Sequence, residues 1–382
     1  MNLEIDYLWS HKCPKKWNQY TLVALVITII ILLILAGITI ASLRSSGLFS
    51  AAQDAKTKTE EKQLEENTTL NEYANEIAKW TGNSQSKALE VNKKYENKTE
   101  LTDANGNKIV VPAGFKIVSD ATTNNATTVD QGIVIEDATG TATNGSQFVW
   151  IPVGDIKKAD GTTTAIALNR YTFAEDGKPK AQNESAIVSE YDANNNFQEL
   201  ETSTFGNSTG SITAFKTSVA TNGGFYIGRY EARQKSSRKL TTVKTDSVWN
   251  NITQPDAATY SKNMYSTGVT SELMNSYAWD TATLFLQTFG ENNKYSRQNS
   301  LNYGNSETTG TDNDKQCNVY DMASNVYEWT TETYSSSYGP STYRGGDYLN
   351  SDFYTSNRSD CSPSDSSSSI GFRPLLFFSS VL

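Results

Sequence analysis

The stretch RGGDYLNSDFYTSNRSDCSPSDSSSSIGFRP (344–374) has two ordered ends around an irregular centre. It opens with Arg-Gly-Gly (344–346) and closes with Ile-Gly-Phe-Arg (370–373). The paired glycines favour a tight or left-handed turn, the closing Ile and Phe are spaced like two inward-facing residues of a strand, and the arginine at each end suits a structural ion pair. We therefore predict that both ends belong to a folded scaffold and fasten the centre to it.

We call residues 347–369 the Ser/Asp-rich segment. It follows no helical or strand period, and all of its amino-acid types can be reached from the asparagine codon AAC by changing the two adenines. Aromatic side chains supply rigid contact area, and Ser, Asn and Asp supply adaptable hydrogen bonding, as in antibody paratopes. The candidate ligand-binding residues are Asp347, Tyr348, Asn350, Ser351, Asp352, Tyr354, Ser356, Asn357, Ser359, Asp360, Ser362, Ser364, Asp365, Ser366 and Ser367.

A disordered, low-complexity tail is the alternative interpretation of this composition. However, the segment is followed by the apolar run IGFRPLLFF (370–378), which should pack and hold the segment in place. We therefore predict a surface segment that is fastened at both ends.

The overall composition excludes several functions. The formal net charge of −9 argues against nucleic acid as the main partner, because such a partner needs a basic face. The chain has one histidine, His11, so a His-based nucleophile, general base or metal site cannot lie beyond the N-terminus. The three cysteines have no metal-ligand spacing, and Cys317 and Cys361 could pair or remain free thiols.

The N-terminal region predicts a membrane anchor. Residues 21–43 contain no charge, and at about 1.5 Å per residue they can span a bilayer core of roughly 30 Å. A buried core helix would need an apolar partner of equal length, and a secretory signal peptide usually has a shorter apolar region. Lys12, Lys15 and Lys16 precede the run and Arg44 follows it, so the positive-inside rule places the N-terminus in the cytoplasm.

We therefore predict a cytoplasmic leader (1–20), a single-pass membrane helix (21–43), an amphipathic helical stem (44–92) and an extracellular domain (93–382). The N-terminus resembles type IV pilin-like proteins of Gram-positive bacteria, through TLVALVIT (21–28) and LLILAGITI (32–40). Gln19 stands at the cleavage-site glycine of that family, and Ala24 stands near its glutamate. Pilin partners and incorporation into a pilus, or a simple membrane tether, both remain open.

In the predicted extracellular region, short runs typical of strands alternate with residues typical of turns. Asn105-Gly106 and Asn144-Gly145 each separate extended runs and predict hairpins. GGFYIGRYEA (223–232) predicts a strand, SYAWDTATLFLQTF (276–289) predicts a helix, and the polar residues 157–215 are expected to form surface loops. The fold class is therefore α+β.

The block NVYDMASNVYEWT (318–330) combines aromatic residues with two carboxylates, Asp321 and Glu328. We interpret it as core, with Tyr327 and Trp329 buried and the carboxylates accepting hydrogen bonds from nearby backbone groups. No basic or nucleophilic partner lies close in the sequence that would suggest catalysis.

FVWIPVG (148–154), GFYIGRYEA (224–232), the Trp279-Asp280 helix, NVYDMASNVYEWT and RGGDY…IGFRP occur in the order found in formylglycine-generating-enzyme (sulfatase-modifying-factor) domains. The resemblance covers roughly residues 97–378 and implies a variant of the C-type lectin fold. It implies that the scaffold residues are Asn325, Glu328, Trp329, Arg344, Gly345, Gly346, Gly371, Phe372 and Arg373.

The resemblance does not extend to the oxidase chemistry of that family. Its enzymes bind copper through two cysteines after the RGG motif, and here Asn350 and Thr355 occupy those positions. We expect no enzymatic activity, no catalytic residue and no cofactor. Calcium binding is compatible with the fold, but no acidic loop is specific enough to assign, so no metal ligand is named.

The Ser/Asp-rich segment resembles the variable region of diversity-generating retroelement target proteins, in which adenine-directed mutagenesis rewrites a C-type-lectin-like face between fixed RGG-like and IGFR-like ends. On this basis the variable region is 341–373, and the protein is expected to be a bacterial cell-surface receptor or adhesin for a variable protein or glycan ligand. The alternatives are a structural minor pilin with an invariant head and an oxidase with displaced cysteines.

Overall fold

The structure is a computed structural model of the chain. It describes residues 58–59, 62, 87–119, 126–183, 186–188, 196–200, 210–235, 239–244, 247–305, 308–310, 314–334 and 340–379. The predicted leader, membrane helix and most of the stem lie outside these residues. No helix within them is long and apolar enough to cross a membrane.

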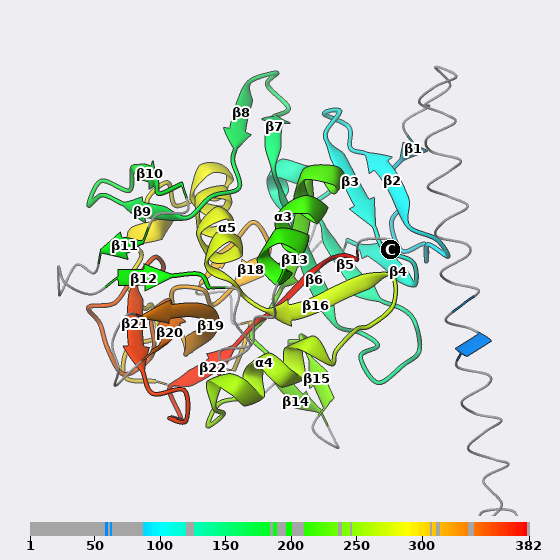
Figure 1. The fold of residues 1–382 in the computed structure, drawn as a ribbon. Coiled ribbons are helices and arrows are strands. Elements are labelled where there is room, and N and C mark those ends of the chain that lie inside the picture. The colour runs from blue at the N-terminus through cyan, green and yellow to red at the C-terminus, as the bar shows by residue number, and fades with distance from the viewer. Residues whose placement is uncertain are drawn as a thin grey trace, which may run out of the picture. The chain divides into compact units, whose positions relative to one another are not determined.

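The chain separates into two compact units, Met1–Gln63 and Leu64–Leu382. In the first unit the structure describes Lys58, Thr59 and Lys62, and these residues are helical. Everything below concerns the second unit, which mixes helices with a larger share of sheet (Figure 1).

The central element is a six-stranded sheet in which neighbouring strands are antiparallel. Its strands, in spatial order, are β16 (Val269–Leu273), β23 (Pro374–Phe378), β13 (Gly224–Gly228), β6 (Gln147–Pro152), β5 (Val134–Asp137) and β4 (Phe115–Val118). The C-terminal strand β23 is therefore an interior strand, so residues that follow the Ser/Asp-rich segment are locked into the middle of the fold.

Both faces of this sheet are buried. Alternate residues of each strand point to opposite faces and pack into different core clusters. Leu375 and Phe377 join one core cluster, and Leu376 and Phe378 join the other. This explains the continuous apolar runs in β13 and β23, where a sheet with one wet face would alternate apolar and polar residues.

Three α-helices cover the sheets: α3 (Ser211–Asn222), α4 (Gln254–Lys262) and α5 (Ser276–Phe289). Residues of α3 and α5 share the cluster with Phe377, whereas Ala257 and Ala258 of α4 belong to the cluster with Phe378. The predicted helix 276–289 is present as α5 with the same bounds, and its N-terminus is capped by the Asn275 side chain, which accepts from Ala278 N at 2.8 Å.

A second six-stranded sheet carries the Ser/Asp-rich segment. Its strands are β11 (Ile187–Val188), β12 (Asn196–Gln198), β19 (Tyr327–Tyr334), β20 (Ser341–Arg344) and β21 (Arg358–Cys361), with β22 (Ile370–Phe372) paired in parallel to β19. The C-terminal part of the block predicted to be core forms the start of β19, and the closing end of the segment pairs directly with β19.

The remaining strands are short. They are β1 (Lys87–Ala88), β2 (Thr99–Thr102) and β3 (Lys108–Val111) in one sheet, and four hairpins: β7 (Gly154–Lys157) with β8 (Thr163–Ile166), β9 (Tyr171–Phe173) with β10 (Pro179–Ala181), β14 (Arg233–Lys235) with β15 (Lys239–Thr241), and β17 (Lys315–Gln316) with β18 (Val319–Tyr320). The 3₁₀ turns are η1 (Val129–Gln131) and η4 (Tyr295–Arg297).

Two sequence expectations need correction. The region 157–215 was predicted to form loops, but it contains most of the hairpins β7–β8 and β9–β10 and the start of α3. The polar residues occupy one face of these strands, and apolar residues such as Ile166 and Phe173 are buried on the other face. The stem was predicted to be helical to residue 92, but β1 pairs with β2 and Val91 bridges to Ile117, so the folded domain begins before residue 93. The hairpin predicted at Asn105-Gly106 is present as β2–β3.

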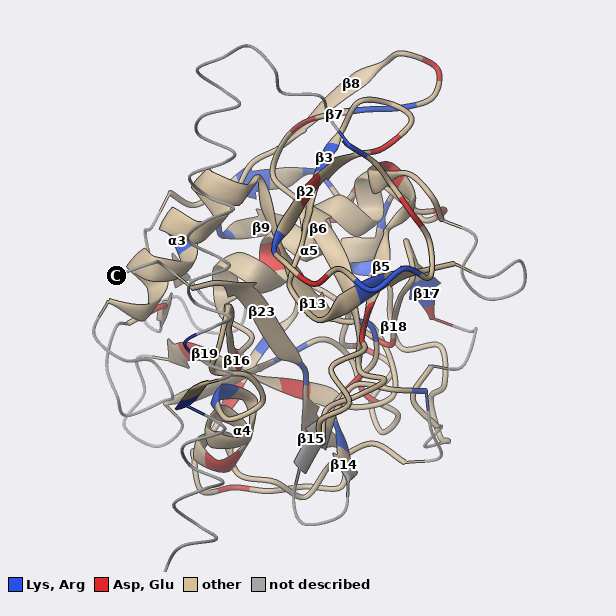
Figure 2. Cartoon of the chain, turned by 90° about the vertical axis from the view of Figure 1, so that its right-hand side faces the viewer, with Lys and Arg blue, Asp and Glu red and all other residues tan. Residues whose placement is uncertain are grey.

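Charged residues are spread through the second unit. Figure 2 shows Lys and Arg positions interspersed with Asp and Glu positions along the described chain.

Candidate functional site

The closing end of the Ser/Asp-rich segment is held by Arg373, whose side chain is fully buried. Its Nη2 donates to Glu328 Oε1 at 2.6 Å and its Nε donates to Glu328 Oε2 at 3.1 Å. Its Nη1 and Nη2 also donate to the backbone oxygens of Gly228 and Tyr320, at 2.8 Å and 2.7 Å. The predicted ion pair at this end is therefore present, and it ties β22 and β23 to β19 and β13.

The opening end is held by Arg344, which is also buried. Its Nη2 donates to Asp280 Oδ1 at 2.6 Å and its Nη1 to Glu332 Oε2 at 3.3 Å. Its Nε donates to the backbone oxygen of Asn357 at 2.7 Å, so the same guanidinium that pairs with two carboxylates also holds residues inside the segment.

Arg344 belongs to a larger buried network, the arginine-rich cluster, which consists of Arg170, Arg344, Arg358, Asp280 and Glu332. Arg358 lies within the segment, ion-pairs with Asp280 and donates from Nε to Glu332 Oε1 at 3.0 Å. Arg170 ion-pairs with Glu332 and donates to the backbone oxygen of Phe197 at 2.9 Å. The cluster joins the loop before β9, α5, β19, β20 and β21 beneath the segment.

The surplus of cations in this cluster decides the protonation of Glu332. Burial disfavours the carboxylate, but the positive charges of Arg358, Arg170 and Arg344 outweigh burial and lower the pKa of Glu332 to about 2. Glu332 is therefore ionised throughout the physiological range.

Arg373 belongs to a second buried network, the acid-rich cluster, which consists of Arg373, Glu328, Glu231, Asp314 and Asp321. Backbone and side-chain donors satisfy its acids: Asn325 Nδ2 donates to Glu231 at 2.6 Å, Gly310 N donates to Asp321 at 2.6 Å, and Tyr295 Oη donates to Asp314 at 2.7 Å. Asp321 thus accepts from a backbone donor as predicted, whereas the partner of Glu328 is an arginine far away in the sequence.

One guanidinium cannot neutralise four carboxylates, so protonation is favoured in this cluster. Burial, reinforced by the charge of Asp314, raises the pKa of Asp321 to about 8. Burial, with the charges of Asp321 and Glu328, raises the pKa of Glu231 well above its ordinary value. The same cause raises the pKa of Asp314 and of Glu328, although Arg373 opposes the effect at Glu328.

The two glycines of the RGG motif are required for different reasons. Gly345 has φ of +84°, the left-handed conformation that was predicted, and a Cβ there would lie 2.6 Å from Met322 O. Gly346 does not adopt a left-handed φ, but a Cβ on it would overlap Ala323 O. The motif therefore lets the chain turn directly against residues 322–323.

The other scaffold residues named from the sequence are buried as well. Trp329 Nε1 donates to Ile252 O at 2.9 Å, and the Phe372 ring lies 5.6 Å from that of Trp249. A Cβ on Gly371 would lie 2.9 Å from Val326 Cγ2. The platform around the segment therefore has little room for substitution.

The segment itself consists of two loops separated by β21. The first loop is fixed by Tyr348 N donating to Asn325 O at 2.9 Å and by Gly304 N donating to Tyr348 O at 2.7 Å. The second loop follows β21, and the Tyr348 hydroxyl and the Ser368 hydroxyl lie 3.1 Å apart. The two loops therefore meet and form one surface.

The candidate ligand-binding residues divide by burial. Ser351, Asp352, Ser364, Asp365 and Ser366 are exposed, and Tyr348, Asn350, Ser359, Asp360, Ser362 and Ser367 are half-buried. The expectation that the whole segment is a surface is wrong for the remaining four, Asp347, Tyr354, Ser356 and Asn357, which are buried.

Tertiary contacts cause this burial. Arg344 draws in the backbone oxygens of Ser356 and Asn357, and Thr355 N and Ser356 N donate to Gln298 O and Ser296 O. No pattern in the sequence indicated that residues 296–304 support the segment, because the two regions are distant along the chain. Leu301 and Tyr303 of that support, and Leu349 of the first loop, are exposed hydrophobic residues.

The thiols are free in the structure and lie on different elements, Cys317 between β17 and β18 and Cys361 at the end of β21. Burial raises the pKa of both, that of Cys361 to about 12. Within the described ranges, no group of three or more His, Cys, Asp and Glu side chains is arranged to hold a metal ion.

Comparison with known proteins finds one family model that matches part of the chain. Residues 213–376 match the model of the sulfatase-modifying factor enzyme 1-like domain, so the sequence prediction of such a domain is confirmed over that range, which is less than half of the chain. A search of curated proteins finds no match.

Several solved structures are similar to parts of the chain. PvdO from Pseudomonas aeruginosa has a TM-score of 0.32 and 16% identity, with 41% of this chain and 82% of PvdO covered. Treponema denticola variable protein 1 has a TM-score of 0.26 and 14% identity, with 62% and 97% covered. The Major Tropism Determinant M1 variant has a TM-score of 0.27 and 10% identity, with 78% and 85% covered. Likenesses this weak do not establish a shared function, and the resemblances to pilins and to retroelement-diversified proteins remain predictions.

Proposed function

We propose that the chain is a ligand-binding protein of the bacterial cell surface, a receptor or adhesin, whose ligand contacts are made by the Ser/Asp-rich segment. The observation that supports this most is the bracing of the segment: Arg344 and Arg373 fix its ends through buried ion pairs, and its two loops meet between them. Side chains on such loops can change without a change in the fold, which is what an adaptable binding surface needs.

Diversification by a retroelement is the finer part of the proposal. It rests on the codon argument, and the structure adds a restriction. The exposed positions 349, 351–352, 364–366 and 368 can accept many side chains, whereas Arg358 and the buried residues 354–357 are held by the arginine-rich cluster and by the backbone of residues 296–298. Diversity should therefore concentrate on the two loop tips.

Display outside the cell is proposed from the sequence alone. Residues 21–43 would anchor the chain with the N-terminus inside, and the helical stem would carry the domain outward. Incorporation into a pilus, and the choice of protein or glycan as ligand, remain parts of this proposal for experiment to decide.

Binding without covalent chemistry is also proposed. Thiolates, not thiols, bind copper and attack substrates, and the raised pKa values of Cys317 and Cys361 keep both protonated near neutral pH. The positions of the family's copper cysteines are Asn350, half-buried, and Thr355, buried. These observations support a binding role over an oxidase role.

The test is deep sequencing of codons 341–373 across many cells of the source population, with a search of the flanking DNA for an adenine-rich near-copy. The proposal expects substitutions at adenine positions, dense at the loop tips and rare at 354–358, with the RGG and IGFR ends constant. An invariant segment with no near-copy would exclude diversification and leave a fixed adhesin or pilus head.

A further inference from the structure

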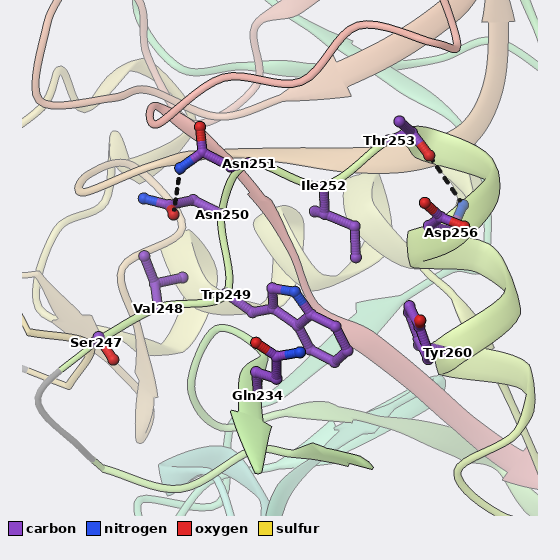
Figure 3. A pocket seen from close by; sticks show the side chains of 10 residues that line it. All are labelled: Gln234, Ser247, Val248, Trp249, Asn250, Asn251, Ile252, Thr253, Asp256 and Tyr260. Carbon is purple, nitrogen blue, oxygen red and sulfur yellow. Dashed lines mark hydrogen bonds between the residues drawn. The ribbon is translucent and has the colours of Figure 1, made fainter. Parts of the chain in front are cut away.

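A pocket of about 430 Å³ lies beside the Ser/Asp-rich segment but is built from other residues. Figure 3 shows it between the end of β14, the loop 247–253 and the first turns of α4. None of its lining residues belongs to 341–373, so its chemistry would stay constant if the segment varied.

The pocket presents hydrogen-bonding groups to its opening. Gln234 and Asp256 are exposed, and neither side chain makes a hydrogen bond within the part of the chain that the structure describes. Asn251 Nδ2 donates to Asn250 Oδ1 at 3.0 Å, which orients the two amides side by side (Figure 3).

Aromatic rings form one wall of the pocket. The rings of Trp249 and Tyr260 are 4.7 Å apart, and Trp249 also packs against Phe372 at the closing end of the segment. Figure 3 shows both rings on the same side, with Gln234 next to the indole. An aromatic wall with polar groups beside it matches a ligand that has apolar C–H faces and a hydroxyl rim.

Hydrogen bonds join the second loop of the segment to the residues that line or border the pocket. Asn251 N donates to Ser367 O at 2.9 Å, Asn250 Nδ2 donates to Ser368 O at 2.7 Å, and Gln254 N donates to Pro363 O at 3.2 Å. A chain-like ligand bound on the segment could therefore extend into the pocket.

The charges of the lining select the ligand class. Asp256 is the one charged side chain among the described residues that line the pocket, and no Lys or Arg is among them. A phosphate, a sulfate or an acidic sugar would meet a carboxylate without a counter-charge, whereas a neutral polyol would donate hydroxyl groups to it. We propose that this pocket binds one neutral hexopyranose residue of a glycan, through the amides of Gln234 and Asn250, the Asp256 carboxylate and the aromatic wall. Its use in adhesion rests on the proposed function, but sugar binding by the pocket does not.

The experiment uses the purified full chain in a mild detergent and saturation-transfer-difference NMR. The probes are the methyl pyranosides of mannose, glucose and galactose, with methyl glucuronide as the matched acidic probe. We expect saturation transfer to at least one neutral glycoside and weaker transfer to the glucuronide. The substitutions Gln234→Ala and Asp256→Ala should each weaken affinity about tenfold, as the loss of one ligand hydrogen bond predicts. Asp155→Ala, which removes an exposed aspartate of β7 away from the lining, should leave affinity unchanged.

Thermal unfolding of each variant shows whether a loss of affinity reflects a loss of folding, and unchanged unfolding with tenfold weaker binding supports the pocket. Absence of transfer to all three neutral glycosides overturns the pocket proposal and leaves the sequencing test of the segment unaffected. If Asp352→Ala abolishes sugar binding while Asp256→Ala does not, the sugar binds on the segment, and the pocket proposal is wrong while the proposed function is supported. Equal binding of the glucuronide would contradict the proposed role of Asp256.

Discussion

The arginine-rich and acid-rich clusters each bury the arginine from one end of the Ser/Asp-rich segment, yet their charge balance is opposite. The first combines three guanidinium groups with two carboxylates, and the second combines one guanidinium with four carboxylates. In the first, the pKa of Glu332 falls to about 2, and in the second the pKa of Asp321 rises to about 8. The same burial therefore has opposite consequences, and the number of neighbouring cations decides between them.

The difference matters because a buried guanidinium and a buried carboxylate respond differently to the loss of a charged partner. A buried guanidinium does not release its proton, so the arginine-rich cluster depends on each of its carboxylates. A buried carboxylate can take up a proton, so the acid-rich cluster can adapt when charge is lost. One end of the segment should therefore be insensitive to pH and intolerant of substitution, and the other end should be sensitive to pH.

The largest effect is expected from Glu332→Gln. This change leaves three buried guanidinium groups facing Asp280 alone, and breaking such a network costs about 3–5 kcal/mol of unfolding free energy. Urea denaturation should show this loss equally at about pH 5 and about pH 8, because the arginines stay charged. The exposed Glu291→Gln is the control and should have little effect. A loss below about 1 kcal/mol would contradict the dependence on Glu332.

Arg373→Met should have the next largest effect, and that effect should depend on pH. Removing the one cation leaves Glu328 without its partner, which should cost about 3 kcal/mol near pH 8. Near pH 5 the loss should be smaller by roughly half, because Glu328 can bind a proton at little cost. Equal losses at both pH values would refute the idea that this cluster adapts by protonation.

The pH dependence of the unaltered chain follows from the same comparison. Asp321 has a folded pKa of about 8 against an ordinary value of 3.8, so between these values the folded state holds an extra proton. Its contribution to stability is present at low pH and is lost as pH rises, with a slope of about 1.4 kcal/mol per pH unit. Asp321→Asn should flatten the decline in urea midpoint across this window.

Glu332 provides the opposite limit at acid pH. The folded pKa of Glu332, about 2, lies below the ordinary value of 4.5. Its contribution to stability is therefore fully present above pH 4.5 and is lost as pH falls through about 2. Stability should therefore decline on both sides of a weakly acidic optimum. An Asp321→Asn variant whose midpoint still declines as steeply as the parent would show that Asp321 does not carry the extra proton and that another acid of the cluster does.

The smallest effects are expected on the exposed loop tips between the clusters. Asp352→Tyr and Ser366→Tyr add large side chains at positions that face solvent, and each should change the unfolding free energy by less than about 0.5 kcal/mol. The matched buried change, Asn357→Tyr, should destabilise much more, because Asn357 is buried against Arg344. Thermal unfolding of the three variants tests whether substitutions are tolerated at the exposed loop tips and not at the residues held by the clusters.

Much of the fold could be predicted from local patterns. The helix 276–289, the hairpin at Asn105-Gly106 and the apolar strand predicted at 223–232 depend on residues that are neighbours along the chain. The helix and the hairpin are present, and the strand is present over Gly224–Gly228. The RGG motif was correctly related to a tight turn at Gly345, but the need for Gly346 comes from its contact with Ala323, which no local pattern predicts.

By itself, the sequence determined the periodicity of the strands and helix α5, the absence of a histidine beyond the N-terminus, and the unusual composition of residues 347–369. It also located the two arginines that fasten that segment. These properties depend on residue type and spacing, which are visible along one chain.

The tertiary structure decided which charges meet and which parts of the segment reach the solvent. Arg344 and Asp280 are 64 residues apart, and Arg373 and Glu328 are 45 apart. Whether a carboxylate loses or gains a proton depends on how many such distant cations the fold brings to it. For the same reason the burial of 354–357 and the pocket beside Asn250 exist only in the folded chain.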